Sequence, residues 1–96
     1  MSDTREWPTD LVGYRRTPDF TENTIPDGLR KTHSTKQGVW ANIHVVEGLL
    51  HFRDHETGTE FDLGPGIHPV IYPEALHDVA PVGTVKFFVE FLKRGT

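Results

Sequence analysis

Three side chains in this sequence, His33, His77 and Glu90, could together hold a divalent metal ion. Two neutral imidazoles and one carboxylate form the ligand set typical of non-haem Fe(II), and the same set suits Zn(II) or Mn(II) with open coordination positions. The chain has no cysteine, so any metal ligand must be a nitrogen or an oxygen atom. Because the three residues are far apart in sequence, separate strands of a barrel would have to bring them together.

Glu90 is unusual because it interrupts the most apolar stretch of the chain, residues 87–92. Both faces of an extended strand over these residues would be apolar, which predicts that Glu90 is buried. A buried carboxylate needs a metal ion, a cation or a network of hydrogen bonds to offset its desolvation. An arginine is the alternative partner to a metal ion, and Arg15, Arg16 and Arg94 are available.

The two candidate histidines have different surroundings in the sequence. His77 follows Pro73 by four residues, where a turn enters a new strand, and alternation predicts that it points inward with Val79 while Asp78 points outward. The alternative for His77 is a histidine bonded to a backbone carbonyl, without a ligand role. His33 lies in a polar segment, and its alternative is an exposed loop residue.

His44 is predicted to lie at the surface or in an interface. It shares a strand face with Trp40 and Val46, opposite the face of Ile43 and Val45. Trp40 and His44 are therefore expected to contact a second copy of the chain in a homodimer. The remaining histidines flank predicted turns and are expected to be solvated: His51, His55 and His68.

Turn-forming residues recur about every ten residues, and helix-period patterns are scarce. The predicted strands span residues 12–16, 39–46, 49–53, 59–63, 68–72, 77–80 and 84–92, and residues 29–35 are expected to be extended. The predicted turns include residues 26–28, 47–48, 64–66 and 81–83. About eight short strands favour an all-β antiparallel sandwich or barrel. We expect residues 1–10 to form a flexible arm and residues 11–96 to form a single domain.

Composition excludes several classes of partner. The net charge is −4 with histidines neutral, and the ten Lys and Arg residues are scattered, so nucleic acid and anionic membranes are not expected to bind. The N-terminus has no basic, apolar signal-peptide pattern, and no apolar stretch is long enough to span a bilayer. A cytoplasmic protein is expected. A domain of 96 residues has a thin core, which a metal ion or a second subunit would supplement.

Several short motifs in combination resemble the small TehB-like cupins, single domains similar to the N-terminal part of some tellurite-resistance TehB proteins. The matching residues are Leu29, 33–36, 38–40, 46–48, Pro73, 77–79, Phe87 and 89–91. The resemblance runs from about Gly13 to Leu92 and implies a cupin fold, a jelly-roll β-sandwich or barrel.

The match to the general cupin pattern is incomplete. Thr35 stands where that pattern has a second histidine, and no glutamate occurs near Trp40. Gly48 matches the glycine that closes the first motif, and Gly66, Pro73 and His77 match the second motif. The ordinary four-ligand cupin site is therefore reduced, and Glu90 is the candidate for the missing carboxylate.

The resemblance implies a small cupin related to tellurite or oxyanion stress resistance. Together with the residues above, it predicts that His33, His77 and Glu90 hold one divalent ion (Zn, Fe or Mn). Water or a small oxyanion would fill the open positions, and Thr35 and Phe88 are expected in the ligand pocket. The alternatives are a non-catalytic module or sensor that binds a small ligand or anion, and a structural homodimer without a metal. No glycine-rich nucleotide-binding loop is present, so methyl transfer from S-adenosylmethionine is not expected of this chain.

Overall fold

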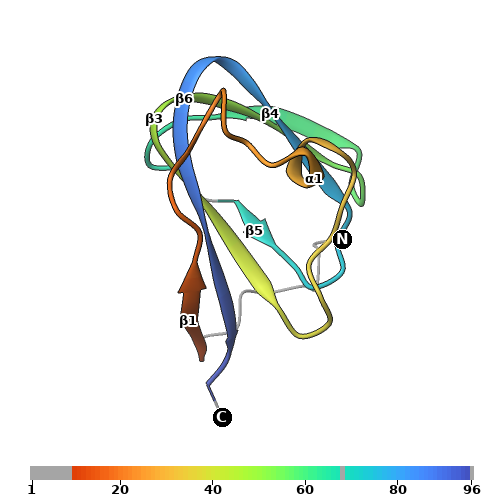
Figure 1. Cartoon of the computed structure of the whole chain (residues 1–96). Coiled ribbons are helices and arrows are strands. Elements are labelled where there is room, and N and C mark those ends of the chain that lie inside the picture. Colours follow the sequence, from red (N-terminus) through yellow and green to blue (C-terminus); the bar gives the residue numbers. More distant parts are fainter. Residues whose placement is uncertain (1–9, 68, 96) are drawn as a thin grey trace.

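Two long antiparallel strands, β3 (Trp40–Asp54) and β6 (His77–Arg94), form the centre of the computed structural model, which describes residues 10–67 and 69–95. They pair along almost their whole length, from Trp40 opposite Leu92 to Asp54 opposite His77. Figure 1 shows this ribbon arching over the interior of the molecule. Every other strand pairs with one of these two.

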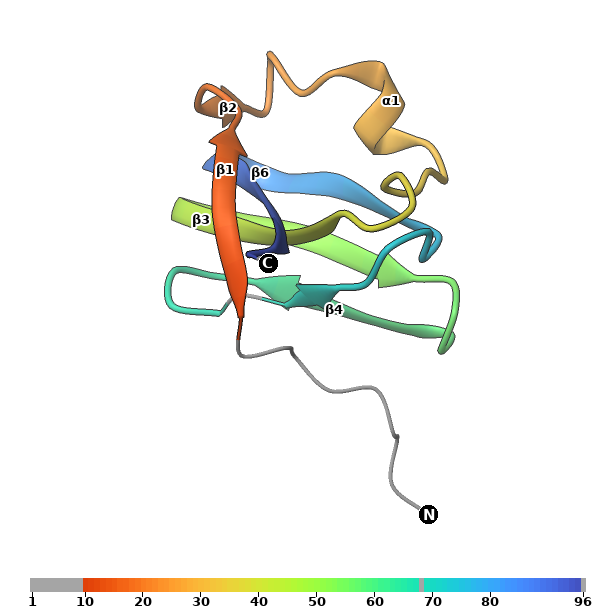
Figure 2. The ribbon, with the colours of Figure 1, turned by 90° about the horizontal axis from the view of Figure 1, so that it is seen from below.

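The shorter elements lie along the edges of this ribbon. The strands β1 (Leu11–Arg16) and β2 (Phe20–Thr21) pair with β6, whereas β4 (Thr59–Leu63) and β5 (Val70–Ile71) pair with β3. All these pairings are antiparallel, so the predicted all-β antiparallel class is confirmed. Figure 2 shows the same arrangement from a second direction, with α1 (Asp27–Arg30) beyond β6.

Two of the predicted turns are wrong, because the structure has bends inside continuous strands at these places. Residues 47–48 do not end a strand: the pairing of β3 with β6 shifts between Val45 and Glu47 and again between Gly48 and Leu49. Gly48 has a φ of 81°, and a Cβ atom there would overlap the Thr84 carbonyl. Residues 81–83 likewise lie within β6, since β-bulges let a strand bend without ending. Residues 49–53 are thus a continuation of β3 and not its hairpin partner.

The predicted turn at residues 26–28 is also different in the structure. Pro26 precedes a single helical turn, α1, and the chain becomes extended only after this helix, later than the predicted start at residue 29. The predicted N-terminal arm lies outside the described residues except for Asp10, whose carboxylate forms an ion pair with Arg94. No helix in the described part of the chain is long and apolar enough to cross a membrane.

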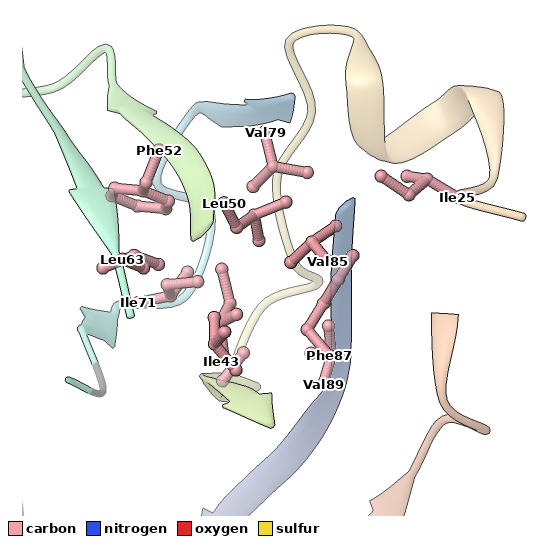
Figure 3. Close-up of a cluster of buried hydrophobic side chains, with 12 residues drawn as sticks. Ile25, Ile43, Leu50, Phe52, Leu63, Ile71, Val79, Val85, Phe87 and Val89 are labelled. Atoms are coloured by element: carbon pink, nitrogen blue, oxygen red, sulfur yellow. The ribbon is translucent and has the colours of Figure 1, made fainter. Parts of the chain in front are cut away.

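Alternating residues of β3 and β6 form the core. Ala41, Ile43 and Val45 are buried on one face of β3, as their spacing predicts, and Phe87 and Val89 of β6 lie beside them on the same face. Figure 3 shows the labelled side chains of this core: Ile43, Phe87 and Val89 lie with Leu50 and Phe52 of the second half of β3 and with Leu63 and Ile71. Burial of each of the larger side chains (Val, Leu, Ile and Phe) contributes about 1.5–3 kcal/mol, which makes this face the main source of stability.

Candidate functional site

His33 and His77 lie side by side although 44 positions separate them. Each backbone N–H donates to the carbonyl of the other residue, with both N–O distances 2.9 Å. Their imidazole rings meet edge to face, with centroids 4.2 Å apart and planes at 64°. The first residue of β6 and the loop after α1 are thus joined at one point, and the structure brings together two of the three predicted ligands.

Backbone carbonyls determine which nitrogen of each imidazole ring carries the proton. Nδ1 of His33 lies 2.8 Å from the Lys31 carbonyl oxygen, and Nδ1 of His77 lies 2.8 Å from the Ala75 carbonyl oxygen. A carbonyl oxygen only accepts hydrogen bonds, so each Nδ1 must carry the proton. In the neutral rings both Nε2 atoms therefore present a lone pair. This is the arrangement in which a histidine binds a metal ion, its other nitrogen held by a backbone carbonyl.

His77 is buried, with 5% of its surface exposed. Burial lowers its pKa, the hydrogen bond to the Ala75 carbonyl opposes this effect, and the neighbouring His33 lowers it further, so that the pKa of His77 lies below its ordinary value. His77 is thus neutral at physiological pH. The alternative interpretation, a histidine bonded to a backbone carbonyl, describes its Nδ1 but leaves its Nε2 without a role.

The two histidines line a pocket of about 330 Å³ between the sheet and the loop that follows α1. Thr35 lines this cavity, and its hydroxyl donates to the Val39 carbonyl over 2.8 Å. Most of the wall is apolar, including Leu29, Ile43, Ile71, Val79, Phe87 and Phe91. Arg15 and Lys36 also line this pocket, and among the described residues no carboxylate does. The pocket therefore combines two histidine rings, apolar walls and two cationic side chains.

Glu90 lies away from this pocket, so the predicted three-ligand set does not assemble. Its parity in β6 places it on the opposite face of the sheet from Phe87 and Val89, where 36% of its side chain is exposed. Its carboxylate lies 3.1 Å from Nε2 of His44. The prediction that Glu90 is buried between two apolar faces was wrong, because one of these faces is only partly covered and leaves the carboxylate in contact with solvent.

Phe88 belongs to the same outer face, and its predicted place in the ligand pocket was wrong. Its ring stacks on His44, with centroids 4.7 Å apart and planes at 8°, and the Arg16 guanidinium lies 3.7 Å from its centroid. Phe88 and Glu90 line a separate depression together with His44 and Arg16, and residues 13–15 of β1 border it. We call these four residues the outer cluster.

No ion pair joins Glu90 to any of the three arginines that were its alternative partners. Arg16 is directly opposite Glu90 in the pairing of β1 with β6, but its guanidinium binds Asp19, with 2.7 Å between Nη2 and Oδ1. Arg94 binds Asp10, and Arg15 lies beside the pocket. Within the described part of the chain, the side chain that binds the Glu90 carboxylate is His44.

Trp40 and His44, the predicted interface residues, lie on the outer face and are partly buried within the single chain. The indole Nε1 of Trp40 is buried without a hydrogen-bond partner among the described residues. Partial burial by their own chain neither requires nor excludes a second copy, so the homodimer stays a prediction.

Two histidines predicted to be solvated bind carboxylates on the outer face, and His68 lies outside the described residues. His51 contacts Asp62 through Nδ1 and Glu60 through Nε2, each at 2.8 Å. His55 contacts Asp78 at 2.6 Å. Both pairings join separate strands or turns, which alternation in one strand does not reveal.

Asp78 points away from His77, as alternation predicts, yet it is buried. Burial raises its pKa, but hydrogen bonds from Arg53 and His55 outweigh burial, and the pKa of Asp78 lies below its ordinary value. Arg53 and His55 thus hold Asp78, the neighbour of His77, on the outer face of the sheet.

Across residues 10–67 and 69–95, no three His, Cys, Asp or Glu side chains are grouped to hold a metal ion.

Comparison with known proteins agrees with this architecture. A family model described as the TehB-like domain matches residues 15–89. Two proteins from Haemophilus influenzae strains Rd and 10810, each named "Probable S-adenosyl-L-methionine-dependent methyltransferase TehB", are 32% and 31% identical to this chain over 75 residues. The match covers 73% of this chain and 26% of each relative, so the chain spans about a quarter of the length of these relatives.

Solved structures show the same fold. The crystal structure of TehB from Haemophilus influenzae superposes with a TM-score of 0.82 and 27% identity, over 90% of this chain and 32% of that one. An Escherichia coli K12 protein gives a TM-score of 0.80 at 21% identity, over 97% of this chain and 100% of that one. A Bacteroides fragilis cupin gives 0.53 at 18%, over 67% and 52%. The last two show the fold alone, which is cupin-like.

Proposed function

This chain belongs to the TehB-like domain family, and from that premise we propose that it is a cytoplasmic cupin-type protein that holds one divalent metal ion between His33 and His77. The proposal includes a role in resistance to oxyanions such as tellurite. It differs from the sequence-based prediction in one respect: Glu90, which lies on the outer face, is not a ligand.

The single observation that carries the proposal is the pair of Nδ1 hydrogen bonds to the carbonyls of Lys31 and Ala75. They leave two Nε2 lone pairs beside one pocket, and the lowered pKa of His77 keeps that ring unprotonated. A neutral acceptor pair of this kind suits a cation or a hydrogen-bond donor and does not by itself attract an anion. Zn(II), Fe(II) and Mn(II) all accept imidazole nitrogen, so the donor set fits each of these ions.

Two histidines leave several coordination positions to water or to a small exogenous ligand. When bound, the metal ion would act as a Lewis acid that polarises this ligand. In this arrangement His33 and His77 bind the ion, Thr35 helps to shape the wall, and the apolar side chains exclude bulk water. We assign no turnover to the site.

Metal content tests this proposal. The protein is purified without a His tag and dialysed against buffer with traces of Zn(II), Fe(II) or Mn(II). Elemental mass spectrometry should then find about one ion per chain. His33→Gln and His77→Gln should each lose most of it. Glu90→Gln and His44→Gln are the matched controls on the outer face and should keep it. Full metal content in both pocket variants would contradict the proposal.

A second candidate, a metal-free pocket for a small molecule, is favoured by the 330 Å³ volume and the largely apolar wall. A ligand with a hydroxyl or N–H group could donate to the two Nε2 atoms directly. Under this alternative, protein treated with EDTA should bind such a ligand as tightly as untreated protein, as measured by calorimetry, and should show no metal dependence.

The homodimer through Trp40 and His44 is a separate proposal, compatible with either candidate. It is supported by exposed apolar side chains near this face, among them Val46. Light scattering of the purified protein, compared with a Val46→Glu variant, would check it, and a monomeric wild-type protein would rule it out.

A further inference from the structure

A β-bulge in β1 separates two neighbouring arginines onto opposite faces of the sheet. In the pairing of β1 with β6, Gly13 is opposite Leu92, Arg15 is opposite Phe91 and Arg16 is opposite Glu90, so Tyr14 is the extra residue. Residues directly opposite each other in an antiparallel pair share a face. Arg15 therefore shares the pocket face with Phe91, whereas Arg16 lies on the outer face with Glu90. Bulges next to binding sites commonly redirect a side chain in this way.

The two arginines have different electrostatic partners. Arg16 lies over Phe88 and forms an ion pair with Asp19. Arg15 is exposed at the edge strand and borders the outer depression as well, but unlike Arg16 it also lines the pocket, with its guanidinium carbon 6.0 Å from the centroid of Phe91. In the described part of the chain no carboxylate pairs with it. Lys36 adds a second cation to the same pocket. A cation next to an apolar cavity without a carboxylate is set to receive an anionic group from outside.

We infer that the pocket binds a small organic anion whose carboxylate pairs with Arg15, assisted by Lys36. Its apolar part packs on Leu29, Ile71 and Phe91. The size and lining of the pocket support this class of ligand, because a bare inorganic oxyanion would leave much of the 330 Å³ and its apolar wall in contact with water. The inference rests on the proposed function in that it places this ligand in the same pocket as the two histidines.

Calorimetric titration with straight-chain carboxylates from acetate to hexanoate tests the inference, with phosphate and tellurite as inorganic probes. Affinity should rise about fourfold for each added methylene until the pocket is filled, as expected for burial of a CH₂ group. Arg15→Gln should weaken hexanoate binding at least about tenfold, the usual effect of losing a charged hydrogen bond. Arg15→Lys keeps the charge but not the planar guanidinium, so its affinity for hexanoate should lie between those of the wild type and Arg15→Gln.

Arg16→Gln is the matched control, since it removes the same charge from the neighbouring position on the outer face. Its affinity for hexanoate should stay close to that of the wild type. Equal losses in Arg15→Gln and Arg16→Gln would overturn the inference, because they would indicate a general effect of net charge. Phosphate or tellurite binding as tightly as hexanoate would also overturn it, since the apolar wall would then have no role.

The outcome is separable from that of the metal proposal. Metal content of Arg15→Gln should equal that of the wild type, because Arg15 is not a ligand. If no metal is bound but hexanoate binds in an Arg15-dependent manner, the metal proposal fails and the organic anion stands. If metal is bound through His33 and His77 but no carboxylate binds to wild-type protein, the metal proposal stands and the organic-anion inference fails. Circular dichroism of each variant checks that it is folded.

Discussion

The two faces of the β3–β6 ribbon each carry histidines, but they use them differently. On the pocket face, His33 and His77 are held through Nδ1 by backbone carbonyls, and no carboxylate of a described residue is hydrogen-bonded to their Nε2 atoms. On the outer face, Nε2 of His44 is bonded to Glu90 and its ring is stacked on Phe88. A histidine whose ring nitrogen and ring face are both engaged serves structure, whereas one with a free nitrogen beside a cavity is available for a ligand.

The difference arises from what covers each face. The pocket face is covered by the loop after α1, which excludes water and leaves a cavity between apolar walls. The outer face is only partly covered, so its polar groups pair with one another and stay near solvent. Histidines are therefore expected to contribute to ligand binding on the pocket face and to stability on the outer face. Three predictions on stability test this division, and they are given from the largest effect to the smallest.

Phe87 and Phe88 are neighbours in β6 that point to opposite faces. Phe87 is fully buried, and Phe87→Ala should lower the free energy of unfolding by about 3–5 kcal/mol through lost burial and a cavity. Phe88→Ala removes the stacking on His44 and the contact with Arg16, and should cost about 1–2 kcal/mol. Urea unfolding of both variants measures this, and a larger loss in Phe88→Ala would contradict the assignment of the core to the pocket face.

His51 lies on the outer face, and its charge should make part of the stability depend on pH. Hydrogen bonds to Asp62 and then Glu60 raise the pKa of His51 above its ordinary value of about 6.5. Its contribution is therefore complete below about pH 6.5 and is lost as the pH rises through the folded pKa. His51→Gln should lower the free energy of unfolding more at pH 5.5 than at pH 8.5.

The measurement for His51 is urea unfolding at both pH values in the presence of EDTA, so that metal binding does not contribute. Lys86→Gln, on the neighbouring strand β6, is a control for a general charge effect. If His51→Gln lowers the free energy of unfolding equally at the two pH values, the contribution of His51 to stability does not depend on its charge, and the prediction is wrong.

Gly13→Ala should have the smallest effect and tests whether the outer cluster is independent of the pocket. A Cβ atom at Gly13 would overlap the Glu90 carboxylate, but this carboxylate is the end of a flexible side chain and can move. Loss of its hydrogen bond to His44 should cost about 0.5–1 kcal/mol. Metal content and carboxylate affinity should not change. A clear loss of either would show that the two faces are coupled.

The sequence predicted the fold class because turn residues and alternation are local properties. It also predicted that Ile43 and Val45 of β3 lie on the face opposite His44, and both are buried. The bends at Gly48 and Pro81 were predicted as turns, because glycine and proline favour a turn and a bulge alike. Which of the two occurs depends on whether a partner strand continues past the bend, and that is a non-local property.

The candidate site divides in the same way. Parity within a single strand predicted His77 to point inward, and the structure places it beside His33 through a pair of backbone hydrogen bonds. Parity alone misassigned Glu90, because two apolar neighbours do not show whether the face they form is covered. Arg15 was considered only as a partner for Glu90, because a β-bulge has no reliable signature in one sequence, and a shift of one residue moves a side chain to the other face.

The sequence by itself determined an all-β chain with nitrogen and oxygen ligands only, no cysteine chemistry and the inward-facing His77. These properties follow from composition and from the two-residue period of a strand. Only the tertiary structure decided that His33 joins His77, that Glu90 joins His44, and that Arg15 and not Arg16 faces the pocket. Each of these contacts joins segments far apart in sequence, and register and coverage between such segments are set by the packing of the whole sheet.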